Sequence, residues 1–323
     1  MLRSPEHMRK LVHLFLFLLL FSSVLISQTT APVTSEQQRS LRAKLEESIR
    51  DVDIRLDGVV GVAILDLTNG EWITFHADQI FPTASSIKVP LLVELYRQNE
   101  QAEQGQPGKA RLSDIYVVNK ADDVPDSEIF NGLTPGVTKL TLRDLAQMVV
   151  AVSDNSATNV LIDRVGMQNV NQMLQSLSLT HTRLQRKMMD IKAAQEGREN
   201  LSTPREFTML FEALYRNKLM SQASTDALIS LLKTRKDSPM QRALMFNGQV
   251  ADKHGELDGV RCDMGIIYAP NRPFVISVMT SYLKSERDGE DAIAEIAQAA
   301  YSYFDRVGRS SQYGRAMQPP PQP

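Results

Sequence analysis

Strand patterns occur in two separated stretches of this chain, and a long helical stretch lies between them. Runs rich in Val and Ile cover Gly58 to Leu67 and Glu71 to His76, and the Asn69-Gly70 turn between them predicts a hairpin. Strand patterns return only at Gly259 to Tyr268 and Phe274 to Leu283. Since a single sheet would collect both sets of strands, the chain is predicted to form an α/β domain split in sequence around an inserted helical domain.

Helical patterns flank the strands and fill the stretch between them. Apolar residues recur at a spacing of four between Thr34 and Arg50, as in an amphipathic helix on a sheet, and a last helix is predicted over Glu290–Val307. In the middle stretch, Thr141 and Thr203 each precede a carboxylate by three residues, which marks a helix start. We therefore expect an α/β plus all-α fold, an antiparallel sheet flanked by N- and C-terminal helices with an inserted helical domain.

The chain is expected to divide into several parts. Arg3, Arg9 and Lys10 precede an apolar run over Leu11–Ile26, a pattern typical of a signal peptide, with an uncleaved N-terminal anchor as the alternative. The protein is then exported, periplasmic or secreted, and membrane-attached only if this segment stays uncleaved. The predicted parts are a signal peptide or anchor at 1–27, a split α/β domain at 34–80 and 247–308, a helical domain at 81–246 and a disordered tail at 309–323.

Charge and side-chain content exclude several classes of function. With a formal net charge of -2 over 323 residues, nothing in the composition suggests binding to nucleic acid. The histidines are scattered without the spacing of metal ligands, so the sequence predicts no metal site and no cofactor. Cys262 is the single cysteine, so no intramolecular disulfide can form. We expect a monomer that is stable through its core.

A serine and a lysine lie together where the first hairpin gives way to the helical stretch. Ser85 and Lys88 are three residues apart, which puts both on one face of a helix. A serine hydroxyl becomes a strong nucleophile when a base takes its proton, and a lysine can do so where burial and a nearby positive charge lower its pKa. The backbone N–H of Ser85 at a helix N-terminus could also stabilise developing negative charge. A capping serine beside a surface lysine is the alternative.

Two further short motifs follow along the chain. Ser153-Asp154-Asn155 lies between two predicted helices, where an ordinary helix cap is the alternative. Lys253-His254-Gly255 lies at the start of the returning strands, where a glycine would let a substrate backbone approach and a lysine would add positive charge. An edge-strand lysine is the alternative there. In the order S-x-x-K, S-D-N and K-x-G, the motifs resemble the signature of class A β-lactamases and penicillin-binding proteins.

The resemblance to that family covers nearly all of the chain after the signal segment. Leu140–Leu145, Thr203-Pro204, Ala251–Lys253 and Gly265–Ile267 look like class A segments in the same order. It implies the family's fold, a split α/β domain around a helical one, in agreement with the pattern above. It also implies a small-molecule substrate, a β-lactam or a peptidoglycan-like amide.

The resemblance implies a role for each matching residue. Ser85 would be the acylated nucleophile, Lys88 its proton acceptor, and Ser153 a proton shuttle to the leaving nitrogen. The backbone N–H groups of Ser85 and Glu256 would form the oxyanion hole. The implied substrate-binding residues are Asn155, Lys253, His254, Gly255, Glu256 and Arg261.

His254 and Glu256 depart from the family's pattern, and the role of Arg261 has an alternative. His254 replaces the family's Ser or Thr hydroxyl; it could donate a hydrogen bond and make activity pH-sensitive near neutrality, or it could be a solvent-facing strand residue. Glu256 puts a negative charge where a substrate carboxylate should lie, which disfavours a standard β-lactam pose. Arg261 would be a further carboxylate anchor, or would instead pair with Asp258 or Asp263.

The family's water-activating glutamate has no counterpart in this chain. Its place in the omega loop falls on Met188, which cannot take a proton, so the acyl-enzyme is expected to be hydrolysed slowly. Asp190 is the candidate catalytic replacement, and Glu196 and Glu199 are less favoured candidates. The alternative for Asp190 is a carboxylate that only braces the loop. Three hypotheses follow: a β-lactamase-like hydrolase with slow deacylation, a penicillin-binding protein that stays acylated, and an esterase or peptidase for non-lactam substrates.

Overall fold

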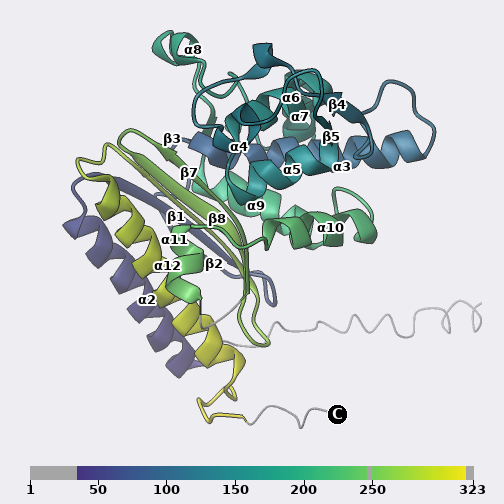
Figure 1. Cartoon of the computed structure of the whole chain (residues 1–323). Helices are drawn as coiled ribbons and strands as arrows, with labels where there is room; N and C mark the ends of the chain where they lie inside the picture. The colour runs from purple at the N-terminus through teal and green to yellow at the C-terminus, as the bar shows by residue number, and fades with distance from the viewer. Residues whose placement is uncertain (1–34, 246–248, 318–323) are drawn as a thin grey trace, which may run out of the picture. The chain divides into compact units, whose positions relative to one another are not determined.

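The computed structural model describes residues 35–245 and 249–317, as Figure 1 shows. The predicted signal or anchor segment at 1–27 lies outside the described residues, as do the last six residues of the predicted tail. Within the described ranges, none of the helices has both the length and the apolar character of a membrane span.

A five-stranded antiparallel sheet in the order β2-β1-β9-β8-β7 collects strands from both ends of the described chain. The predicted hairpin forms, with Gly70 at a φ of +79° in its turn. Strand β1 pairs with β9, so the predicted antiparallel sheet is confirmed. The strands are β1 (Val59–Asp66), β2 (Trp72–Phe75), β7 (Gln249–Leu257), β8 (Val260–Tyr268) and β9 (Phe274–Ser281).

Strand β7 is a full strand that the sequence pattern did not reveal. The pattern indicates two returning strands, and the structure has three. Asp252 and Lys253 are consecutive and both buried in β7, so charged residues interrupt the apolar pattern by which a strand is recognised. As the outer strand of the sheet, β7 is a place where an extended ligand can lie alongside the backbone.

Two long helices cover one face of the sheet and lie alongside each other in Figure 1: α2 (Glu36–Arg55) and α12 (Glu286–Gly308). Both were predicted, although α12 begins earlier than the apolar pattern indicates because Ser285 caps it. Apolar side chains from both helices and from the sheet form one core cluster, which includes Ile49, Ile276 and Ile296. The predicted flanking of the sheet by the terminal helices is therefore confirmed.

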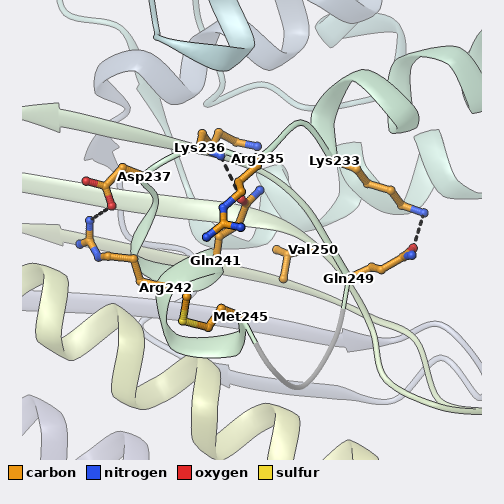
Figure 2. A pocket seen from close by; sticks show the side chains of 9 residues that line it. All are labelled: Lys233, Arg235, Lys236, Asp237, Gln241, Arg242, Met245, Gln249 and Val250. Atoms are coloured by element: carbon orange, nitrogen blue, oxygen red, sulfur yellow. Dashed lines mark hydrogen bonds and ion pairs between the residues drawn. The ribbon is translucent and has the colours of Figure 1, made fainter.

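A short helix, α11 (Pro239–Leu244), packs with these terminal helices. Met240 and Leu244 belong to their core cluster, although the sequence pattern places α11 in the helical range 81–246. A cavity of about 640 Å³ lies beside the start of β7. Figure 2 shows the side chains that line it, several of them from α11 and the loop before it.

The start of the predicted tail is also ordered. Ser310 pairs with Ala316 across a tight turn, and the backbone N–H of Met317 donates to the carbonyl of Arg309 at 2.7 Å. This differs from the disorder that composition indicates for 309–323, because backbone hydrogen bonds close the turn without a hydrophobic core.

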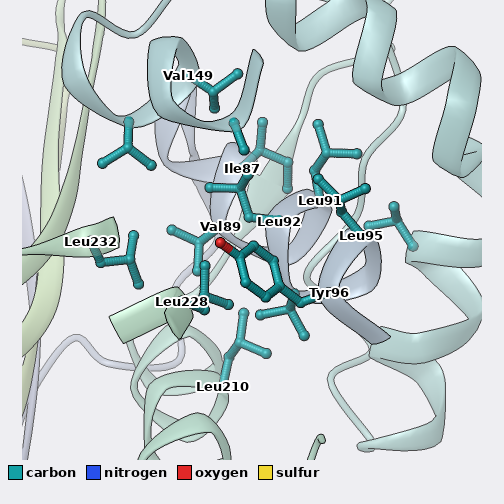
Figure 3. Close-up of a cluster of buried hydrophobic side chains, with 14 of the residues drawn as sticks. Ile87, Val89, Leu91, Leu92, Leu95, Tyr96, Val149, Leu210, Leu228 and Leu232 are labelled. Carbon is teal, nitrogen blue, oxygen red and sulfur yellow. The ribbon is translucent and has the colours of Figure 1, made fainter. Parts of the chain in front are cut away.

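Helices α9 (Pro204–Tyr215) and α10 (Gln222–Leu232) pack on the opposite face of the sheet, and further helices pack against α10 and against one another. Helix α3 is central: Figure 3 shows its Leu92 and Leu95 among Leu210 of α9 and Leu228 of α10. The predicted helix starts are confirmed, since Thr141 and Thr203 accept hydrogen bonds from the residues three positions on. The helices of this part are α3 (Lys88–Glu103), α4 (Glu128–Asn131), α5 (Leu142–Ala151), α6 (Asn155–Val165), α7 (Met167–Ser176), α8 (Ile191–Gln195), α9 (Pro204–Tyr215) and α10 (Gln222–Leu232). Short 3-10 turns and strand pairs complete it: η1 (Ala84–Ile87), η2 (Lys120–Asp122), β3 (Phe81–Pro82) with β6 (Leu201–Ser202), and β4 (Ile115–Val117) with β5 (Lys139–Thr141).

Candidate active site

A cavity of about 480 Å³ lies between the helical part and the end of β7, with Ser85 in its wall. Of the other predicted site residues, Asn155, Glu256 and Arg261 line the same cavity. Lys88 and Lys253 are buried beneath it and reach its polar groups through Ser153 and Asn155. The structure thus brings the three motifs together from distant parts of the chain.

Ser85 lies in η1, immediately before α3. The residue before it, Ala84, has a φ of +48°, a backbone conformation that non-glycine residues rarely adopt. A Cβ on Gly255 would lie 2.6 Å from the carbonyl oxygen of Thr83 and 2.8 Å from the backbone nitrogen of Ser85. The sequence predicts that Gly255 lets a substrate backbone come close. In the structure, the backbone that comes close to Gly255 is the turn that carries Ser85. Among the described residues, the Ser85 hydroxyl has no hydrogen-bond partner, so it is free to meet a ligand.

The side chain of Ser153 lies between two buried lysines. Its Oγ is 3.1 Å from Nζ of Lys88 and 3.1 Å from Nζ of Lys253. Nζ of Lys88 also donates to the carbonyl oxygen of Ser153 at 2.5 Å and to Oδ1 of Asn155 at 2.9 Å. Ser153 has a φ of +55°, and such backbone strain is typical of functional sites. Asp154 is a helix cap, as the alternative states, because its carboxylate caps α6. Ser153 and Asn155 on either side of it instead bind the buried lysines.

Burial and repulsion between like charges lower the pKa of both lysines. The pKa of Lys88 lies well below 10.5, first because the side chain is buried and second because Lys253 is positively charged. The pKa of Lys253 is lowered to about 8 by burial and then by the charge of Lys236. A lowered pKa makes the neutral amine of Lys88 available at a lower pH than in a free lysine, as a general base requires. The surface-lysine alternative for Lys88 is wrong, since this residue is 1% exposed. Lys253 does lie on the outer strand of the sheet, as the edge-strand alternative states, but it is 0% exposed and so does not face solvent.

Sequence and fold both match a known family. The family model of the beta-lactamase enzyme family matches residues 44–304. The chain belongs to this family. Beta-lactamase CARB-3 of Pseudomonas aeruginosa is 24% identical over 300 residues, which span 91% of this chain and 99% of that protein. A beta-lactamase structure from Sphaerobacter thermophilus DSM 20745 has a TM-score of 0.72 at 31% identity over 81% of this chain and 97% of its own. The structure of PBP-A, with a TM-score of 0.72 at 23% identity over 81% of this chain and 96% of its own, supports the fold alone.

In this member of the beta-lactamase family, Arg261 is already occupied. Its Nη2 lies 2.5 Å from a carboxylate oxygen of Glu286, its Nε lies 3.4 Å from Glu290, and Nη1 donates to two backbone carbonyl groups. The expected anchoring of a substrate carboxylate by Arg261 is not supported, because its charge is neutralised within the protein. The alternative that Arg261 pairs with Asp258 or Asp263 is also wrong, since its carboxylate partners are Glu286 and Glu290 of α12.

Met188 lines the cavity with Ser85, and its backbone is held in place by Asn159. The N–H of Met188 donates to Oδ1 of Asn159 at 2.8 Å, and Nδ2 of Asn159 donates to the carbonyl of Met188 at 3.1 Å. Asp190 is exposed, and its carboxylate accepts from the N–H of Ala193 at 3.0 Å as the cap of α8. Asp190 is not among the residues that line the cavity, so the structure does not bring it to Ser85 and the loop-bracing alternative fits it.

The other carboxylates suggested as bases are also bound elsewhere, and several residues of the cavity wall were not predicted, Arg186 and Asp126 among them. Glu199 lies 2.7 Å from Arg186, and Glu196 lies 2.5 Å from a neighbouring arginine. Arg186 and Asp126 both line the cavity. Asp126 has a φ of +54°, and its negative charge raises the pKa of Lys88. No motif singles out Asp126, because it lies in a loop whose path follows from tertiary packing.

His254 is neutral in this site. Burial, followed by the positive charge of Lys253, lowers its pKa to about 2. The expectation that His254 makes activity pH-sensitive near neutrality is therefore not supported, and neither is a solvent-facing position, since its side chain is 14% exposed. Its Nε2 lies 3.6 Å from Oε1 of Glu256, which is half-exposed at the cavity.

Proposed function

We propose that the chain is an exported serine hydrolase that opens a β-lactam or a peptidoglycan-like amide through an acyl-enzyme on Ser85. The observation that carries this proposal is the position of Ser153, whose Oγ bridges Lys88 and Lys253 beneath the cavity that holds Ser85. Together, these groups supply a nucleophile, a base and a path for the transferred proton. The protein acts as a monomer without a metal or organic cofactor in this proposal.

The proposed reaction begins with neutral Lys88. It takes the hydroxyl proton of Ser85 as the oxygen attacks the substrate carbonyl, and the backbone N–H groups of Ser85 and Glu256 hold the oxyanion. Ser153 then passes a proton to the leaving nitrogen and recovers one from Lys88, which returns to its neutral form. The C–N bond breaks, and an ester to Ser85 remains.

Slow deacylation is part of the proposal. Met188 occupies the cavity wall and cannot activate water, and Asp190 caps α8. These observations favour a second candidate function, a penicillin-binding protein that acylates and remains acylated. A third candidate, an esterase or peptidase for non-lactam substrates, is favoured by the charges at the cavity. Asp126, Glu256 and Asp258 line it, while both of its arginines are paired with glutamates of the protein.

The test is intact mass spectrometry of the chain from Gln28 onward, incubated with benzylpenicillin, while loss of the drug is followed in parallel. The Ser85→Ala variant is the matched control. An adduct on the wild type alone, with steady loss of the drug, supports the β-lactamase-like hydrolase. A persistent adduct without drug loss supports the penicillin-binding candidate. Absence of both excludes β-lactam chemistry and directs the assay to simple esters and peptides.

Replacing Glu256 with glutamine is expected to speed acylation by benzylpenicillin about fivefold at low ionic strength. A like charge near 4 Å in water costs on the order of 1 kcal/mol, and salt screens it, so the gain should shrink at 1 M salt. The second-order rate constant of acylation is measured at both salt concentrations. Glu47→Gln, on the exposed side of α2, is the control. Equal rates for Glu256→Gln and the wild type at low salt would show that Glu256 does not oppose the substrate carboxylate.

A further inference from the structure

A buried ion pair lies behind β7, on the face opposite to the candidate active site. Nζ of Lys236 lies 3.0 Å from Oδ1 of Asp252, and both side chains are fully buried. Nε2 of Gln241 donates to the same carboxylate oxygen at 2.8 Å, and Figure 2 shows Lys236 and Gln241 meeting from the loop and from α11. Nζ of Lys236 also donates to the backbone carbonyls of Leu232 and Thr234, at 2.7 and 3.0 Å. The ammonium group therefore has an acceptor for each of its three hydrogens.

Asp263 of β8 brings a second carboxyl group to the same place. Its Oδ2 accepts a hydrogen bond from the N–H of Met240 at 3.0 Å. Its Oδ1 and the Oδ2 of Asp252 are both buried, and neither has a partner among the described donors. One proton between the two carboxyls satisfies both oxygens, and two carboxylates beside a single ammonium group cannot both stay charged at low cost. Burial and then the charge of Asp252 raise the pKa of Asp263 well above its usual value, which agrees with a shared proton.

The pair lies close enough to act on the candidate catalytic lysines. Asp252 precedes Lys253 in β7, so their side chains lie on opposite faces of the strand, and that of Lys253 reaches Ser153. The charge of Lys236 lowers the pKa of Lys253, and the negative charge of the carboxyls raises it. The other titratable or charged groups around this cluster are His254, Glu256, Arg261, Cys262, Arg242 and Glu290.

We propose that Lys236, Asp252 and Asp263 form a positioning unit that is neutral as a whole, shares one proton between its carboxyls, and sets the electrostatic field at Lys253 and thereby at Lys88. This inference rests on the proposed function, because the unit affects catalysis through those two lysines. It also ties α11 and the end of α10 to the strand that borders the active site.

The shared proton gives an unusual pattern of variant effects on the pH dependence of acylation. The acid limb is the part of the pH profile in which the acylation rate rises with pH as the lysines lose their protons. Asp252→Asn and Asp263→Asn each remove one carboxyl and leave one negative charge. In each single variant the acid limb therefore lies at the same pH as in the wild type. The double variant leaves Lys236 without a counter-charge, and its acid limb moves to lower pH by roughly one pH unit. Adding Lys236→Met to the double variant restores neutrality and returns the limb to its original place. Asp237→Asn, an exposed neighbour, is the matched control and shows no movement.

Two patterns would overturn the inference. If each single variant moves the limb and the double variant moves it by the sum, both carboxyls are ionised and no proton is shared. If the double variant does not move it, the unit exerts no field on the lysines. The carboxyl carbon shifts of Asp252 and Asp263 in the wild type give a check that needs no variant, since one proton should remain on the pair at neutral pH.

A readout without substrate separates this inference from the proposed function. The side-chain carbon shifts of Lys88 and Lys253, followed by NMR as the pH is changed, report their titration directly. If the wild type forms no adduct but the lysine titrations follow the pattern above, the proposed function fails and the unit stands. If acylation occurs and the titrations do not change in the double variant, the unit fails alone.

Discussion

The Lys88→Met variant is expected to acylate Ser85 about 10²- to 10⁴-fold more slowly than the wild type, the range that a positioned general base contributes. Nζ of Lys88 is fully buried, touches Ser153 and Asn155, and has its pKa lowered by burial and by Lys253. In the wild type, acylation should rise with pH as Lys88 loses its proton, and this limb should lie below the pH at which a free lysine titrates. Stopped-flow acylation across pH checks both expectations.

The Lys88→Arg variant separates a base from a fixed positive charge. A guanidinium group keeps the charge and can donate to the same acceptors, but it does not lose its proton in a protein. If Lys88 acts as the base, the arginine variant is as slow as the methionine variant and loses the acid limb. Near-normal acylation by Lys88→Arg would assign Lys88 an electrostatic role only. A thermal unfolding curve for each variant shows that the fold is retained.

Local patterns were enough to predict much of the fold. The turn at Asn69-Gly70 and the caps at Thr141 and Thr203 act within a few residues, so they are visible in the sequence and reappear in the structure. The long terminal helices were visible because one face of each is apolar over several turns. The three motifs were predicted to come together because their order resembles that of a known family, and the geometry of Ser153 agrees.

The parts that escaped prediction depend on contacts between distant residues. Strand β7 buries Asp252 and Lys253 next to each other, which its sequence pattern does not reveal. Their partners are distant in sequence, because Asp252 pairs with Lys236 between α10 and α11, and Lys253 binds Ser153. The occupation of Arg261 depends on two glutamates of α12, and the neutral state of His254 depends on burial. Asp126 reaches the cavity through the path of a loop. A periodic pattern carries none of this information.

Replacing Met188 with glutamate is expected to shorten the lifetime of the acyl-enzyme by about 10²- to 10⁴-fold, the contribution of a general base that activates water. The backbone of Met188 is fixed on both sides by Asn159, and its side chain lines the cavity that holds Ser85. A carboxylate introduced there should therefore reach water beside the ester. Mass spectrometry after removal of free benzylpenicillin measures the decay of the adduct, and drug loss under steady-state conditions measures the gain in turnover.

The matched control is Met188→Gln, which has nearly the same size and polarity as the glutamate variant but cannot take a proton. A faster decay in the glutamate variant alone assigns the gain to proton transfer, and it should vanish at low pH as the new carboxylate becomes protonated. Equal acceleration in both variants would mean that polarity alone admits water. No acceleration in either would show that the loop keeps position 188 out of reach of the ester, and that slow deacylation has a cause other than the missing carboxylate.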